Sequence, residues 1–267
     1  MKETYNVLTI ASSDNSGGAG LEADIKTISS LGCYAAVAIS GIAVENTVRV
    51  QAVYPVTPHQ LDEQIVVTCE DIRIDAVKIG LLPTKELVAQ TAKTLRNTGL
   101  KNIVIDPVLV AACGDSLADT DIIGTYISEL FPLASVITPN RFEAEQLFVH
   151  SPLQNILQSG AKSILLKGGH SDDVQEVIDE LWLKDEANPV KYFAKRIKTN
   201  NLHGTGCTLS SAIASFLSIY DGDIVLAVEK AKEYITSAIE AGKNLSIGKG
   251  NGPVNHIFSP VAMLTRD

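Results

Sequence analysis

The stretch NLHGTGCTLSSAIASFLS, residues 201–218, is a glycine-rich turn that runs into a helix. Gly204 and Gly206 let the backbone turn with its N–H groups pointing one way, and apolar residues then recur at helical spacing. The first N–H groups of a helix are unpaired and carry partial positive charge, so this turn predicts a site for an anion such as phosphate. Cys207 falls in the first helical turn, where we expect the pKa of its thiol to be lowered. The alternative is a glycine-rich cap on a core helix.

Length and composition fit a single globular domain, residues 1–267, large enough for a sheet with helices on both faces. Apolar residues make up 45% and charged residues 20% of the chain, a balance that argues against disorder. The net charge of −9 argues against nucleic acid or an anionic membrane as the main partner. An anionic substrate must therefore be bound by local donors.

The cysteine pattern and the N-terminus indicate the compartment. Cys33, Cys69, Cys113 and Cys207 are widely spaced and form no C-x-x-C pair, which predicts free thiols in a reducing compartment rather than a disulfide framework or a cysteine metal site. Residues 1–5 lack a signal-peptide pattern, and no apolar run approaches membrane-spanning length. We expect a cytoplasmic protein that does not bind membranes.

Short apolar runs alternate with amphipathic segments along the chain. The predicted strands cover residues 7–11, 35–43, 48–56, 76–80, 102–106, 135–138 and 163–167, and residues 181–184 and 190–194 predict a small antiparallel pair. The predicted helices cover residues 21–32, 58–71, 85–97, 119–130, 140–148, 206–217 and 223–243. This alternation predicts an α/β fold with a mostly parallel sheet, in which ligands bind beyond the carboxyl ends of the strands.

Polar residues repeatedly end these apolar strands. They are Asp14 with the glycines that follow it, Lys78-Ile79-Gly80-Leu81, Asp106-Pro107-Val108, Thr138-Pro139-Asn140 and Lys167-Gly168-Gly169-His170. Together they predict one shared cleft. Each of them alone fits a solvated loop equally well.

The same motifs carry a family resemblance over nearly the whole chain. Residues 14–20, 23–27, 45–47, 78–80, 106–108, 138–140, 167–170, 203–210 and 248–256 resemble, in order, the hydroxymethylpyrimidine/phosphomethylpyrimidine kinases of thiamine biosynthesis. These enzymes belong to the ribokinase-like superfamily, which also contains pyridoxal kinases. The resemblance implies a ribokinase-like three-layer α/β sandwich, a homodimer, and the use of ATP and Mg²⁺. It also implies phosphorylation of a pyrimidine hydroxymethyl group and then of the resulting monophosphate.

Phosphoryl transfer needs in-line positioning and positive charge around the transferring group. We expect the amides of Gly204, Thr205, Gly206 and Cys207 to bind the transferring phosphate, with Thr205 also on the nucleotide side. Family members carry a cysteine at the position of Cys207, and we hypothesise that its sulfur accepts the proton of the substrate hydroxyl. The alternative is a small thiol packed under the anion site.

The remaining nucleotide and metal residues follow from charge and from the resemblance. Lys167 is expected to reach the ATP phosphates, and Asn140 belongs by resemblance to the nucleotide side. Asp106 and Glu143 offer the oxygen ligands that Mg²⁺ prefers, directly or through water. For Glu143 the alternative is a carboxylate that stabilises a helix N-terminus.

The substrate pocket is where the sequence departs from the family. We expect Glu45, Asp24 and Val108 to line the substrate ring, with Ser12 and Leu81 beside them. The family usually has glutamine, glycine and methionine at the positions of Glu45, Ser12 and Leu81. An ionised glutamate only accepts hydrogen bonds, so the ring is either an aminopyrimidine with a protonated nitrogen or a different ring, such as pyridoxal. A ligand-binding protein without catalysis is the third alternative, against which the retained Asp106, Lys167 and Cys207 argue.

Overall fold

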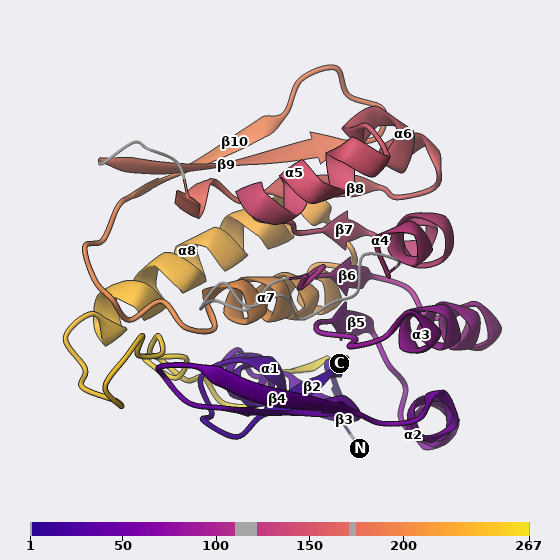
Figure 1. Cartoon of the computed structure of the whole chain (residues 1–267), viewed down its shortest axis with the longest axis horizontal. Helices are drawn as coiled ribbons and strands as arrows, with labels where there is room; N and C mark the ends of the chain where they lie inside the picture. The colour runs from indigo at the N-terminus through magenta and orange to yellow at the C-terminus, as the bar shows by residue number, and fades with distance from the viewer. Residues whose placement is uncertain (1, 110–121, 171–174, 267) are drawn as a thin grey trace.

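The computed structural model describes residues 2–109, 122–170 and 175–266, and within them a nine-stranded sheet forms the centre of the molecule (Figure 1). The strand order is β10-β9-β8-β7-β6-β5-β2-β3-β4. The central pairings from β3 through β2, β5, β6 and β7 to β8 are all parallel, which confirms the predicted mostly parallel sheet. The strands are β2 Asn6–Asp14, β3 Tyr34–Glu45, β4 Val50–Pro55, β5 Ala76–Ile79, β6 Ile103–Ile105, β7 Val136–Ile137, β8 Ser163–Leu166, β9 Glu176–Leu183 and β10 Val190–Lys195.

Both edges of the sheet are antiparallel. The expected pair at 181–184 and 190–194 exists, but β9 begins earlier, at Glu176, and also pairs with β8, so the two strands extend the main sheet. Asp179 within β9 obscured this in the sequence, since a carboxylate is unfavourable inside a strand. The structure supplies its partner from a distant helix, because Lys232 Nζ lies 2.7 Å from Asp179 Oδ2. At the ends of the chain, β1 (Glu3–Thr4) pairs with β11 (Thr265–Arg266).

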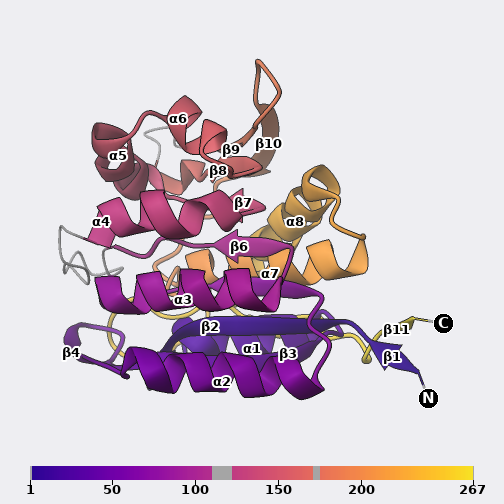
Figure 2. The ribbon, with the colours of Figure 1, turned by 90° about the vertical axis from the view of Figure 1, so that its right-hand side faces the viewer.

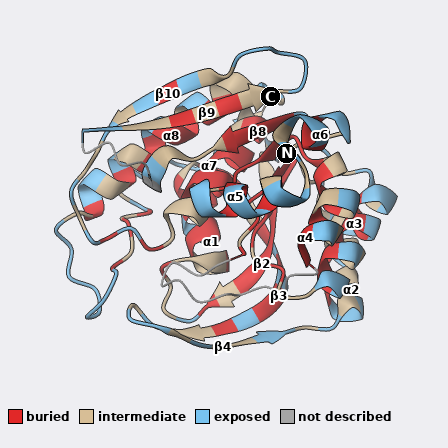
Figure 3. Cartoon of the chain, turned by 45° about the horizontal axis from the view of Figure 1, so that its top comes forward, coloured by how far each residue is buried: buried red, intermediate tan, exposed pale blue. Residues whose placement is uncertain are grey.

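Helices cover both faces of the sheet and complete the predicted three-layer sandwich (Figure 2). Two apolar cores result, one on each side of the sheet. Successive side chains of a strand point to opposite faces, so each strand contributes residues to both cores. Ile103 and Ile105 of β6 face one core, and Val104 faces the other. Buried residues accordingly concentrate in the central strands and on the inner helix faces (Figure 3). One layer contains α2 Pro58–Asp71, α3 Lys85–Thr98, α4 Ile122–Thr125, α5 Arg141–His150 and α6 Leu153–Gln158, and the other contains α1 Gly20–Ser30, α7 Thr205–Ile219 and α8 Ile224–Gly242.

Local sequence signals explain most helix boundaries. A capping box of Thr57 and Gln60 starts α2, and Gly99, with φ of 65°, ends α3. The predicted helix 119–130 is described only from residue 122, as α4 followed by a π-helical turn (Tyr126–Leu130) and a 3₁₀ turn (Phe131–Leu133), and its predicted start lies outside the described residues. The short helix α6 was not predicted. None of the described helices is both long and apolar enough to cross a membrane.

The thiols of Cys33, Cys69 and Cys207 are free, as predicted, and Cys113 lies outside the described residues.

Candidate active site

The N-terminus of α7 packs directly on the loop that follows β2. Gly204 precedes α7 with φ of 78°, a left-handed conformation that favours glycine. A Cβ atom at Gly204 would lie 1.9 Å from the carbonyl oxygen of Gly18, so no other residue fits without movement of the backbone. The turn at 201–207 and the loop at 14–20 therefore form one structural unit.

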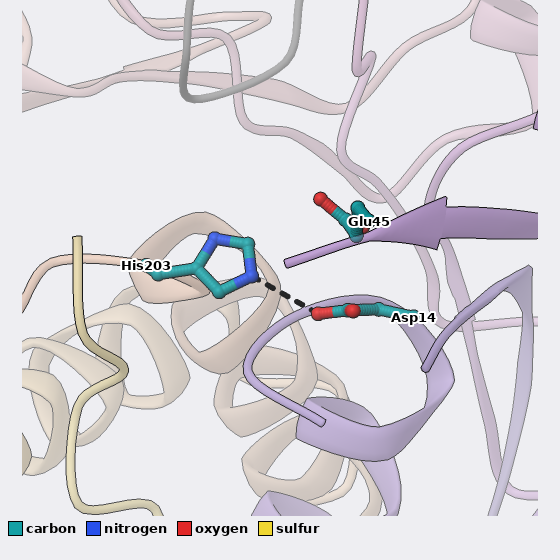
Figure 4. Close-up of side chains that lie close together, drawn as sticks. All are labelled: Asp14, Glu45 and His203. Carbon is teal, nitrogen blue, oxygen red and sulfur yellow. Dashed lines mark hydrogen bonds and ion pairs between the residues drawn. The ribbon is translucent and has the colours of Figure 1, made fainter. Parts of the chain in front are cut away.

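Asp14 holds this unit together. Its carboxylate accepts hydrogen bonds from the backbone N–H groups of Ser16 (2.7 Å), Gly18 (3.1 Å) and Ala19 (2.8 Å). Its Oδ2 also lies 3.0 Å from Nε2 of His203 (Figure 4). Burial opposes ionisation of Asp14, but the hydrogen bonds from His203, Ser16 and Ala19 outweigh it and hold the pKa of Asp14 well below its usual range. An ionised Asp14 thus fixes the glycine loop against the start of α7.

Glu45, at the end of β3, lies beside this pair (Figure 4). One ligand atom each of Asp14, Glu45 and His203 falls within 4.8 Å of the others, so the three carry the donor types of a metal site. Burial and the charge of Asp14 raise the pKa of Glu45 to about 7. Burial lowers the pKa of His203, but the hydrogen bond to Asp14 and the charges of Asp14 and Glu45 together outweigh it and raise the pKa. Because Asp14 is already engaged by the loop amides and His203, we interpret the cluster as a loop clamp.

A second cluster gathers Asp106, Lys167 and Glu143. Lys167 Nζ lies 2.8 Å from Asp106 Oδ1 and 3.9 Å from Glu143 Oε2. The hydroxyl of Thr138 donates to Asp106 Oδ1 at 2.9 Å. The helix start faces this cluster, since a Cβ atom at Gly206 would lie 3.2 Å from Asp106 Oδ2 and 3.4 Å from Lys167 Nζ. We call the turn at residues 204–207 the anion turn. The structure thus brings together the anion turn, the lysine and the two carboxylates that the sequence assigned to phosphate and metal.

Asn140 and Glu143 also form the start of α5. The N–H of Asn140 donates to Glu143 Oε2 at 2.7 Å, and the N–H of Glu143 donates to Asn140 Oδ1 at 3.0 Å. This capping box confirms the helix-stabilising alternative for Glu143 and engages the side chain predicted to face the nucleotide. Burial raises the pKa of Glu143 to about 7 against the opposing charge of Lys167. The remaining carboxylate oxygens of Asp106 and Glu143 suit Mg²⁺, a hard cation that retains several waters.

Beneath the turn lies a fully enclosed lysine–aspartate pair. Lys78 Nζ lies 2.8 Å from Asp24 Oδ2, and both side chains are 0% exposed. The hydroxyls of Thr9 and Ser211 each donate to Asp24 at 2.7 Å. Since neither oxygen of Asp24 reaches a surface, the prediction that Asp24 lines the substrate ring is wrong. The sequence showed the carboxylate but not its burial between α1, β5 and α7.

The thiol of Cys207 also differs from its prediction. Burial raises its pKa to about 12, although the ammonium of Lys78 acts in the opposite direction. The prediction of a lowered pKa is therefore wrong, because desolvation of the sulfur outweighs the partial charge of the helix start.

The other predicted substrate residues fall in three places. The hydroxyls of Ser12 and Ser40 are 3.0 Å apart, and that of Ser40 donates to the carbonyl of Leu81 at 2.6 Å, so Ser12 and Leu81 lie close together. Val108 sits beside Asp106, whose carbonyl accepts from the N–H of Val108 at 2.9 Å. Glu45 lies in the cluster of Asp14 and His203.

Sequence reasoning gave no chemical role to Asp14, His203 or Lys78. Asp14 carried a usable signal, because it comes shortly after a predicted buried strand and precedes a run of small residues at 15–20, the pattern of a carboxylate that binds loop amides. Lys78 and His203 stand in motifs, but nothing in the sequence pointed to their partners, which lie 54 and 189 residues away.

A groove of about 780 Å³ lies elsewhere, between β3 and α2. Its walls include Ile39, Ile42, Val56 and Val67, and none of the predicted site residues lines it. Ser13, Gln60, Glu63 and Gln64 also line it, but its lining, among the residues that the structure describes, includes no lysine or arginine that could bind a phosphate. The start of α7 is therefore the candidate active site.

The chain is similar to known proteins over nearly its whole length. The profile of the family described as phosphomethylpyrimidine kinase matches residues 14–255. A hydroxymethylpyrimidine/phosphomethylpyrimidine kinase from Rhizobium meliloti (strain 1021) is 42% identical over 95% of this chain and 97% of its own length.

Two solved structures show the same fold. An ADP complex of Bacillus subtilis pyridoxal kinase superposes with a TM-score of 0.85 at 32% identity, over 95% of this chain and 98% of that chain. A phosphomethylpyrimidine kinase from Clostridium difficile 630 superposes with a TM-score of 0.74 at 37% identity, over 88% of this chain and 99% of that chain. The sandwich, the anion turn and these relatives together show that the chain belongs to the phosphomethylpyrimidine kinase family, with a ribokinase-like fold.

Proposed function

We propose that this phosphotransferase uses ATP to phosphorylate 4-amino-5-hydroxymethyl-2-methylpyrimidine, and then its monophosphate, in thiamine biosynthesis. The observation that carries the proposal is the convergence of Gly206, Asp106 and Lys167 at the start of α7. Amides, an ammonium group and carboxylates within a few ångströms are what transfer of a phosphoryl group requires. The relative from Rhizobium meliloti, which bears the name of this activity, supports the same substrate.

The transferring phosphate is proposed to bind the amides of residues 204–207, and Lys167 to leave Asp106 and bind the ATP phosphates. Asp106 and Glu143 would hold Mg²⁺ through their free oxygens and water. The ion supplies positive charge that neutralises the phosphate oxygens. Loss of one such donor costs about 10²–10³ in rate in comparable anion holes.

Cys207 is proposed to face the acceptor alcohol and to take its proton. Its place in the first turn of α7, beside the anion turn, supports this role. Cys207→Ala should lower kcat strongly and leave the affinity for ATP unchanged, measured by coupled ADP release. Near-normal turnover of that variant would leave Cys207 with the packing role only.

The substrate ring is proposed to lie near Glu45. Protonated Glu45 both donates and accepts, as glutamine does, and therefore suits the edge of an aminopyrimidine. A pyridoxal kinase is the second candidate, favoured by the close superposition on the Bacillus subtilis enzyme. Turnover of both rings by the parent and by Glu45→Gln distinguishes them, because a specificity residue changes their ratio. An unchanged ratio removes Glu45 from the pocket.

The groove between β3 and α2 is proposed to be where a second copy packs in a homodimer. Ile39, Ile42 and Val67 are 38%, 50% and 62% exposed there. Size-exclusion chromatography with light scattering on the parent and on Val67→Asp tests this assignment, and a monomeric parent contradicts it.

ADP release with the pyrimidine, then with its monophosphate, is the decisive assay. Release with both alcohols supports the two-step kinase. Ligand binding without ADP release would instead indicate a non-catalytic ligand-binding protein.

A further inference from the structure

Lys78 has no role in the chemistry described so far, although its burial is costly. The side chain is 0% exposed in β5, and moving an ammonium group out of water is unfavourable. Burial lowers its pKa but the charges of Asp24, Cys207 and Asp106 raise it more, so the lysine stays charged. A methionine would fill similar space at this position. The charge itself therefore requires an explanation.

The pleat of β5 directs Lys78 toward α7. Val77 and Ile79 face the core beneath α2 and α3, so Lys78 between them faces α1 and α7. Its ammonium group lies near the carboxyl end of the strand, because a Cβ atom at Gly80 would be 2.6 Å from Nζ. This is the end of the sheet at which the anion turn sits.

The register of α7 places Cys207 above the pair. Ser211 donates to Asp24 Oδ1 at 2.7 Å, and Cys207 precedes Ser211 by four residues, so the two side chains share one face of the helix. The charged groups that act on the thiol come from four sides: Lys78 from β5, Asp24 from α1, Asp106 after β6 and Lys167 after β8. Lys78 exerts the largest effect that favours a thiolate.

We infer that Lys78 is a positioning residue, whose buried ammonium group stabilises the thiolate of Cys207 as the acceptor alcohol is deprotonated. The inference rests on the proposed function. In the step, the O–H bond of the alcohol breaks and its proton forms the S–H bond of Cys207. The oxygen bonds to the γ-phosphorus of ATP, whose bond to the bridging oxygen breaks to release ADP. A base whose pKa lies far above the working pH is mostly protonated, so a cation that lowers the pKa increases the active fraction.

Opposite charges give opposite expected effects. Lys78→Met should lower the rate at which iodoacetamide alkylates Cys207 at pH 8 by about tenfold, one pKa unit. Asp24→Asn should raise that rate, because it leaves Lys78 without its counter-charge. Peptide mass spectrometry measures the alkylation of Cys207 separately from that of the other cysteines. In turnover, Lys78→Met should lower kcat with little change in KM and move the acid limb of the pH profile to higher pH.

Two further variants separate this effect from damage to the fold. Lys78→Met/Asp24→Asn removes both charges, leaves no unpaired ion and should still slow alkylation, because Lys78 acts on the thiol more strongly than Asp24. Lys232→Met breaks the lysine–aspartate pair with Asp179, 2.7 Å long, and should leave Cys207 alkylation at the parent rate.

Alkylation that is unchanged in Lys78→Met and in the double variant, or that shifts the same way in Lys78→Met and Asp24→Asn, overturns the inference. Alkylation needs no turnover. Absence of kinase activity in the parent would therefore reject the proposed function, while the alkylation series still decides about Lys78.

Discussion

Two lysine–aspartate pairs of equal length lie at the same end of the sheet. In each, the ammonium nitrogen is 2.8 Å from a carboxylate oxygen. Lys78 and Asp24 are both 0% exposed and are enclosed by hydroxyl groups, whereas Lys167 is 14% exposed. Lys167 also has a second carboxylate, Glu143, at 3.9 Å.

Under the proposed function, the two pairs serve different purposes. A lysine that binds a phosphate must be able to leave its aspartate, and the 14% exposure of Lys167 beside the start of α7 fits such an exchange. Lys78 has no such route, so its charge acts only on groups already packed around it. A buried pair is costly to break from one side, while an open pair can exchange partners.

The largest expected effect is on stability, from Lys78→Met. The variant leaves Asp24 buried without its cation, which should cost about 3–5 kcal/mol of the free energy of unfolding. Lys167→Met is the matched variant and should cost less, because solvent reaches its side of the pair. Urea unfolding of both proteins measures the difference, and equal losses would remove the distinction between the two pairs.

Turnover should show the reverse order. Lys167→Met should lower kcat/KM for ATP by about 10²–10³-fold, the loss typical of one anion-hole donor. Lys78→Met should lower kcat by about tenfold, since it acts through the thiol by roughly one pKa unit. Coupled ADP release under saturating alcohol measures both, with the urea midpoint as control. A larger loss in Lys78→Met than in Lys167→Met would contradict the assignment of Lys167 to phosphate.

The second carboxylate beside Lys167, Glu143, predicts a pH effect on stability. Glu143 has its pKa raised from 4.5 to about 7, so the folded protein holds a proton that the unfolded chain releases. The contribution of Glu143 to stability is therefore present below about pH 4.5 and is lost as the pH rises through about 7.

Glu143→Gln keeps a capping side chain and cannot ionise. It should be more stable than the parent by roughly 1–3 kcal/mol at pH 8 and about equal at pH 4, measured by urea unfolding at both values. A constant difference across the range would contradict the raised pKa.

The smallest expected effect is on nucleotide binding, from Gly206→Ala. The new methyl group would lie 3.2 Å from Asp106 Oδ2 and 3.4 Å from Lys167 Nζ, in the space assigned to phosphate. We expect affinity for ADP to fall by about tenfold, or 1.4 kcal/mol, measured by calorimetry. Gly204→Ala is the contrasting control: its methyl would lie 1.9 Å from the carbonyl oxygen of Gly18, so it should impair folding instead. Unchanged ADP affinity in Gly206→Ala would move the phosphate site elsewhere.

Much of the site was predictable because its residues follow parallel strands. Asp106 comes after β6 and Lys167 after β8, and parallel strands bring their carboxyl ends to one edge. The glycines at 204 and 206, followed by apolar residues at helical spacing, predicted the helix start. The enclosed pair of Lys78 and Asp24 was not predictable. Asp24 lies on a helix with an ordinary apolar face, and only the packing of α1 against β5 and α7 reveals that its carboxylate is enclosed.

By itself the sequence determined the alternation of strands and helices, the α/β class, the kinase family and the turn that starts α7. These follow from periodicity, glycine positions and motif order, which are local properties of the chain. The tertiary structure alone decided the state of each charge: which aspartate is enclosed, that burial raises the pKa of Cys207 instead of lowering it, and that Asp14 and His203 clamp the loops. Such outcomes depend on desolvation and on partners from distant segments, and both exist only once the sheet and its helices have packed.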